Sequence, residues 1–200
     1  MPTLALALIC LLPLGRHDAR LLGVAEKGVA YLYGTEVKRL EARELPRAAW
    51  YAPRSRWRAE KILAWVDEKV VPGSGCDAVL AFTAEDISTT KGSHVDWGVL
   101  GLANIGGPSG VVSTFRARRG ARGERLARRT VNVVNHELGH VFGLDHHPEG
   151  DCIMHDAEGS VRTVDRESGL LCPASRAAVE QRLRTRLPSP DSFDWSAVLN

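Results

Sequence analysis

The sequence predicts a single α/β domain, and three observations support this prediction. Short apolar runs of the kind that form strands alternate with longer segments in which apolar residues recur at helical spacing. The length of 200 residues suits one domain, and 44% hydrophobic with 25% charged residues is ordinary for a globular chain. No internal repeat interrupts the pattern. We therefore expect one domain over residues 1–200 with one sizeable core.

Residues 4–14 form the most apolar run, and its closing Pro-Leu-Gly predicts a buried first strand that ends in a turn. The run is too short to span a membrane, which takes about 20 apolar residues. A secretory signal is the alternative, but no Lys or Arg precedes the run and no small-residue cleavage site follows it. Four irregularly spaced cysteines do not resemble a disulfide scaffold, so we expect a reducing compartment, the cytoplasm.

The alternation continues along the N-terminal part of the chain. Helical periodicity predicts helices over residues 19–33 and 58–71, which end at Gly34 and at Pro72. Short apolar runs predict further strands, which lie within 35–45 and over 77–83, 99–105 and 110–116. Strands that alternate with helices favour one layered sheet.

A long helix is predicted over residues 126–142, and Gly143 ends it. Residues 144–171 show little periodicity, and a last helix is predicted from Cys172 to residue 187. We expect an N-terminal subdomain over 1–143, a C-terminal subdomain over 144–187, a cleft between them, and a loose tail over 188–200. An irregular stretch of this length inside a domain usually has a functional role or binds a metal ion.

The segment HELGHVFGLDHH, which starts at His136, carries a metal-binding pattern. His136 and His140 are four residues apart on a predicted helix, so both imidazoles leave the same face. Gly143 can take a left-handed conformation that ends the helix and lets His146 return as a third ligand. Three neutral imidazoles with a vacant fourth position are typical of a catalytic zinc site. Glu137 is near enough to a water in that position to accept its proton.

The spacing stays regular beyond the third histidine. Four residues separate His147 from Cys152, Met154 follows two positions later, and 17 residues separate Met154 from Cys172. This register resembles that of the archaemetzincins (archaelysins), zinc metallopeptidases of the metzincin clan, whose motif is HExxHxxGxxHC, four residues, CxM, seventeen residues and CxxC. Looser similarity extends over most of the chain, in the segments RSRW from residue 54, VLAFTAEDI from residue 79, GLA from residue 101 and VVSTFR from residue 111.

The resemblance implies a compact metzincin-like zincin domain of the α/β (α+β) class, with a mixed twisted sheet, a long active-site helix and a small C-terminal subdomain with a Met-turn. It implies that His136, His140 and His146 bind a catalytic Zn²⁺ and that Met154 supports them from below without touching the metal. The implied activity is peptide hydrolysis by a zinc-activated water with Glu137 as general base, as an aminopeptidase or a small-peptide protease. A non-catalytic zinc-binding regulatory protein on the same scaffold is the alternative, and the presence of Glu137 argues against it.

Two positions depart from the family motif, because His147 and Ser175 stand where the motif has cysteine. In the family, four cysteines at these positions hold a second zinc ion. Here His147, Cys152 and Cys172 could still hold one, with Ser175, a water or another side chain as the fourth ligand. The alternative is a metal-free loop that packing alone stabilises.

The expected partner is a peptide or protein substrate that binds as an additional strand along an edge strand over residues 110–116. Seven arginines lie between residues 116 and 129 with one acidic residue, Glu124. They could select acidic peptides or bind nucleic acid, but no aromatic residues or nucleic-acid motif accompany them, so a solvated flank is the simpler interpretation. The net charge of +2 demands neither a nucleic acid nor a membrane. We expect a monomer.

Overall fold

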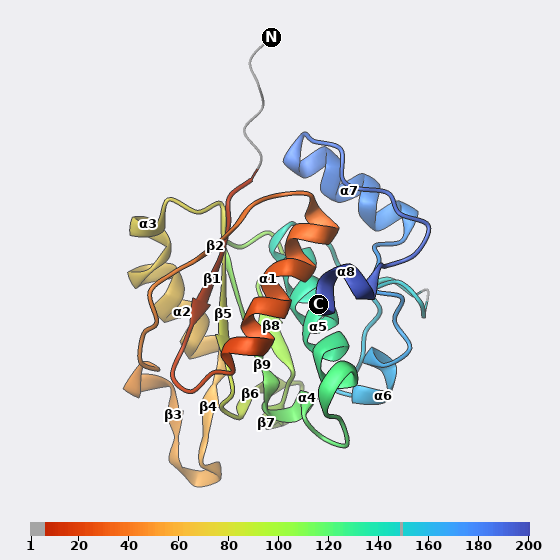
Figure 1. Ribbon diagram of the computed structural model, residues 1–200. Coiled ribbons are helices and arrows are strands. Elements are labelled where there is room, and N and C mark those ends of the chain that lie inside the picture. Colours follow the sequence, from red (N-terminus) through yellow and green to blue (C-terminus); the bar gives the residue numbers. More distant parts are fainter. Residues whose placement is uncertain (1–6, 149) are drawn as a thin grey trace.

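A five-stranded sheet organises the computed structural model, which describes residues 7–148 and 150–200 (Figure 1). The strand order is β2-β1-β5-β9-β8, with the first four strands parallel and β8 antiparallel at one edge. The strands are β1 (Ile9–Pro13), β2 (Val37–Arg39), β5 (Ala78–Thr83), β8 (Gly101–Ala103) and β9 (Ser109–Ser113). Four of them lie within predicted strands, and β9 begins one residue before the strand predicted over residues 110–116, so the α/β class is confirmed. Residues 4–6 of the first prediction lie outside the described residues.

Helices cover both faces of this sheet. Successive residues of β1 point to opposite faces, so Ile9 and Leu11 pack in one core with α1 (Ala19–Tyr33) and α5 (Gly123–Val141). Cys10 and Leu12 pack in a second core with α2 (Ala59–Lys69). Helix α1 has the predicted bounds because both ends are capped, by the Asp18 carboxylate at its start and by a left-handed Gly34 at its end.

The remaining helices are short: α3 (Val71–Ser74), α4 (Thr114–Ala117), α6 (Val161–Val164), α7 (Pro173–Leu183) and α8 (Trp195–Leu199), with 3-10 turns η1 (Arg47–Ala49) and η2 (Ala52–Arg54). The expectation of a loose tail over residues 188–200 is wrong, because α8 packs against α1 and α5 (Figure 1). Val198 is buried, and the ring centroids of Phe193 and Tyr31 are 4.6 Å apart. No helix among the described residues has the length and apolar character that crossing a membrane requires.

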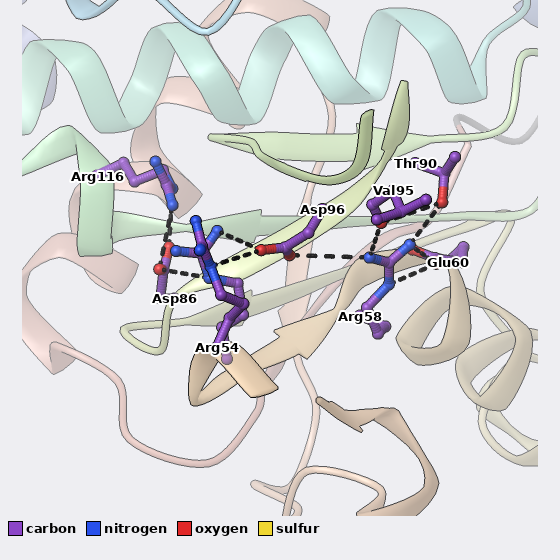
Figure 2. Close-up of polar contacts among 9 residues, drawn as sticks. Arg54, Arg58, Glu60, Asp86, Thr90, Val95, Asp96 and Arg116 are labelled. Atoms are coloured by element: carbon purple, nitrogen blue, oxygen red, sulfur yellow. Dashed lines mark hydrogen bonds and ion pairs between the residues drawn. The ribbon is translucent and has the colours of Figure 1, made fainter. Parts of the chain in front are cut away.

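A second sheet, which the sequence did not predict, has the order β3-β4-β6-β7. Its strands are β3 (Trp50–Tyr51), β4 (Arg56–Arg58), β6 (Ile87–Lys91) and β7 (His94–Gly98). An ion-pair network joins them (Figure 2). Arg56 of β4 bridges Asp86 and Asp96 at 3.3 and 3.2 Å, and Arg116 of α4 binds Asp86 at 2.8 Å. The RSRW segment of the family resemblance therefore links this sheet to the main one.

Replacing Asp86 with asparagine should destabilise the protein by about 3 kcal/mol, because it leaves two largely buried guanidinium groups without their shared anion. The free energy of unfolding in urea measures this loss. Glu68→Gln is the matched control, since the Glu68–Lys69 pair is exposed and such pairs contribute about 0–1 kcal/mol. Equal stabilities of the two variants would contradict a structural role for the network.

One disulfide, between Cys10 and Cys76, is present among the described residues. The irregular cysteine spacing did not predict it, because the two residues are 66 positions apart in the sequence. They meet because β1 pairs with β5, and Cys76 lies just before β5. Disulfides persist mainly in oxidising compartments, so this bond does not support the expected cytoplasmic location. That location stays a prediction.

Candidate zinc site

Helix α5 carries the first two histidines of the motif. The helix is buried along most of its length, so side chains on one face are held in place. His136 and His140 lie one turn apart on that face, and their Nε2 atoms are 3.1 Å apart. The predicted helix therefore brings two ligand nitrogens to one point.

The chain reverses directly after this helix. Gly143 has φ of 92°, a left-handed conformation that glycine adopts at little cost. Its N–H donates to the carbonyl oxygen of His140, and the following residues turn back. The His146 ring centroid then lies 5.3 Å from that of His136 and 4.8 Å from that of His140. The three predicted ligands are thus brought together, with ligand atoms all within 4.8 Å of one another.

Backbone carbonyls orient two of the three rings. His136 Nδ1 lies 2.7 Å from the carbonyl oxygen of Ile153, and His140 Nδ1 lies 2.8 Å from that of Leu144. A carbonyl oxygen only accepts, so each Nδ1 carries the hydrogen and each Nε2 keeps its lone pair. Burial, followed by the neighbouring His140, lowers the pKa of His136 to about 3, which keeps this ring neutral.

The cluster has the chemistry of a zinc site. Two nitrogens bound to a tetrahedral zinc ion at about 2.0–2.1 Å are about 3.3 Å apart, close to the 3.1 Å between His136 and His140 Nε2. Two facing lone pairs at this distance repel each other unless a cation lies between them. Three neutral imidazoles also leave a fourth position open, as in catalytic zinc sites.

Glu137 lines the same pocket as the three histidines. Its side chain is 6% exposed, and burial raises its pKa to about 8. A Cβ atom built on Gly101 of β8 would lie 2.5 Å from Glu137 Oε1, so the edge strand lies in contact with this carboxyl group. A carboxyl group at this place can exchange a proton with a water beside the histidines.

Met154 lies against the helix that carries the histidines. It is fully buried, and a Cβ atom at Gly139, between His136 and His140 on α5, would overlap its sulfur. The segment is fixed on both sides, since Ile153 accepts from His136 and the Met154 carbonyl accepts from the His147 N–H at 2.8 Å. This geometry suits the structural role that the resemblance implies for Met154.

Replacing Gly139 with alanine should destabilise the protein by about 1–3 kcal/mol, because the new methyl group overpacks the buried Met154. Thermal or urea unfolding measures the effect. Gly73→Ala is the matched control, since it lies in α3 with no atom near its Cβ position, and it should be neutral or slightly stabilising. A Gly139 variant that is as stable as the Gly73 variant would show that Met154 does not pack tightly under α5.

A second cluster consists of His147, Cys152 and Cys172, whose ligand atoms also lie within 4.8 Å of one another. Ser175 joins it, with Oγ 3.2 Å from Cys172 Sγ and 3.7 Å from Cys152 Sγ. The two sulfurs are 2.6 Å apart, whereas thiolates on a tetrahedral zinc are about 3.8 Å apart. The residues of the predicted second site therefore meet, but the thiols would have to separate around an ion.

The pocket that contains the histidines has a volume of about 360 Å³ and is lined from both parts of the chain. The edge strand beside it is β8, and our assignment of the edge to residues 110–116 is wrong. Strand β9 is fully buried between β5 and β8, and residues 114–117 form α4.

None of the seven arginines between residues 116 and 129 lines this pocket, so they do not select substrates there. Arg116, Arg118, Arg128 and Arg129 instead form ion pairs within the chain.

Sequence reasoning did not identify four of the acidic residues that line the pocket, among them Asp156 and Glu167. Asp156 Oδ2 lies 3.7 Å from His146 Nδ1, and Glu167 is largely buried. Both lie in the irregular stretch over residues 144–171, where no periodicity indicates which side chains point inward. The only available signal is that this stretch follows the metal-binding motif.

Comparisons with known proteins agree with this geometry. The model of Peptidase family M54 matches residues 98–181. The archaemetzincin of Haloarcula marismortui is 30% identical over 170 residues, which cover 81% of this chain and 93% of the relative. The crystal structure of archaemetzincin from Methanopyrus kandleri matches with a TM-score of 0.75 at 29% identity and covers 89% of this chain and 96% of that one. That from Archaeoglobus fulgidus, complexed with malonate, matches with a TM-score of 0.73 at 27% identity and covers 86% of this chain and 99% of that one. This chain belongs to the archaemetzincins, zinc metallopeptidases of peptidase family M54.

Proposed function

We propose that the protein hydrolyses short peptides at a zinc ion held by His136, His140 and His146, with Glu137 as general base. The observation that carries this proposal is the meeting of three imidazoles, two of them oriented by backbone carbonyls, and a buried carboxyl group in one pocket. When bound, the zinc ion supplies Lewis acidity toward water and toward a peptide carbonyl. Glu137 accepts the proton of the attacking water and then donates it to the leaving amine.

The substrate is proposed to bind as an extended strand against β8. One side of β8 is paired with β9, and its other side is the edge of the main sheet. Leu100, Gly101, Leu102 and Ala103 all line the pocket, so the edge borders the histidine cluster. Backbone donors and acceptors of a sheet edge can pair with any extended peptide and hold its carbonyl groups in a fixed register.

Activity toward quenched fluorescent peptides tests this function. We expect cleavage that disappears after treatment with a chelator and returns when zinc is added. Comparing each peptide with its N-acetylated form separates an aminopeptidase, which needs a free amino terminus, from a small-peptide protease. If the protein retained full cleavage activity after its metal content had fallen to zero, the proposed mechanism would be wrong.

The second cluster is proposed as a structural site in which His147, Cys152 and Cys172 hold another zinc ion. Its position supports this role, because Cys152 directly precedes the segment that contains Met154. An ion here would stabilise the irregular stretch over residues 144–171 without taking part in catalysis.

A further inference from the structure

The pocket contains a second buried carboxyl group, on Glu167. This residue is 8% exposed and lines the pocket together with Val133 and Val164. No hydrogen bond or ion pair to its side chain occurs within the described part of the chain, and burial raises its pKa to about 8. Burying a carboxylate without a partner is costly, so an incoming cation would favour the ionised form of Glu167 that burial alone disfavours.

Contacts on both sides hold Glu167 in place. Before it, Arg129 of α5 pairs with Asp165 at 2.6 Å, and Asn132 donates to the Val164 carbonyl at 3.1 Å. After it, Ser168 Oγ donates to the Asp151 carbonyl at 2.7 Å. Its position is therefore fixed relative to the helix that carries the histidines.

Helical spacing shows where this part of the pocket lies. Asn132 and Val133 are about one turn before His136 and Glu137 on α5, and Arg129 is about two turns before them. Glu167 follows the segment that Arg129 and Asn132 hold against the helix. Its carboxyl group therefore belongs to the part of the pocket on the N-terminal side of the histidines.

The surroundings of Glu167 favour a cationic ligand. Arg129 cannot neutralise it, because its guanidinium is already bound to Asp165 and to the carbonyls of Ala117 and Arg119. Five acidic residues and one lysine line the pocket: Glu137, Asp145, Asp156, Glu158, Glu167 and Lys91. Val133 and Val164 offer apolar contact for the aliphatic stem of a long basic side chain.

We propose that Glu167 binds the cationic side chain of a lysine or arginine adjacent to the scissile bond, and that the enzyme therefore prefers basic peptides. This inference rests on the proposed function, since it takes the pocket as the place where the peptide is cleaved. It makes Glu167 a specificity-determining residue that takes no part in proton transfer.

Matched peptides that differ only by lysine or norleucine at one position test the inference. Norleucine keeps the aliphatic stem and lacks the ammonium group. With the variable residue placed in turn on either side of the scissile bond, we expect a kcat/KM ratio of about 10 or more in favour of lysine on one side. The ratio should fall to about 1 in Glu167→Gln, with circular dichroism and zinc content confirming that the variant is folded.

A third peptide with glutamate at the same position tests the wild-type protein without any substitution. It should be cleaved more slowly than the norleucine peptide, because its charge opposes that of the pocket. Equal rates for the three peptides, or a lysine preference that survives in Glu167→Gln, would overturn the inference.

Binding separates failure of the inference from failure of the proposed function. Fluorescence anisotropy with the zinc-loaded Glu137→Gln protein, and with the same protein also carrying Glu167→Gln, measures affinity without turnover. Tighter binding of the lysine peptide that depends on Glu167, with no cleavage by the wild type, would refute the hydrolytic function and support the cation site. Cleavage of all peptides, together with equal affinities for them, would support the hydrolytic function and refute the cation site.

Discussion

Replacing Glu137 with glutamine should leave the zinc content of the protein unchanged and lower kcat for peptide hydrolysis by about 10²–10⁴-fold, the usual contribution of a general base. Glutamine has nearly the same volume as glutamate, so the buried site at 6% exposure gains neither a cavity nor a clash. The amide cannot accept the proton of the attacking water. The measurement is steady-state cleavage of a fluorogenic peptide together with elemental analysis of the same sample.

A control on the same helix makes this experiment specific. Glu124 lies in the first turn of α5, is exposed and pairs with Arg128 at 2.5 Å. Glu124→Gln should keep wild-type turnover, because it does not line the pocket. If Glu137→Gln retained activity within a few-fold of the wild type, Glu137 would not be the base. If it lost zinc as well as activity, its role would be in holding the site together.

The sequence predicted the histidine cluster because all of its determinants are local. The four-residue spacing of His136 and His140 is converted directly into a common face by the helix, and Gly143 provides the reversal that brings His146 back. Helix α1 was equally predictable, since Asp18 and Gly34 mark its two ends. The fold class and the meeting of the three histidines therefore follow from short-range patterns.

The features that were missed depend on which segments meet in space. Strands β8 and β9 are both short, and only the pairing of β9 with β5 decides that β8 is the edge. Strands β6 and β7 contain few buried apolar residues, so their alternation is weak, and ion pairs hold them instead. Glu167 is likewise buried, and α6, which ends three residues before it, packs against α5. No pattern in the residues around it indicates this burial.

The number of zinc ions is the most informative remaining quantity, and a His136→Ala/His140→Ala variant should contain one ion fewer than the wild type. The substitutions remove two of three ligands from the first cluster, and one imidazole cannot retain zinc at a catalytic site. The second cluster shares no residue with the first, so its content should not change. Elemental analysis of both proteins after dialysis gives the two numbers, and circular dichroism shows whether the variant is folded.

Each pair of values has a definite meaning. Two ions in the wild type and one in the variant would show that His147, Cys152 and Cys172 bind zinc although serine occupies the fourth motif position. A Cys172→Ser variant should then lose the second ion, keep the first, and unfold at a lower temperature, because a bound structural ion contributes folding free energy. One ion in the wild type and none in the variant would mean that packing of the buried thiols holds the loop without metal. Zinc content equal in the wild type and the histidine variant would refute the assignment of His136 and His140 as ligands, since any bound metal would then lie elsewhere.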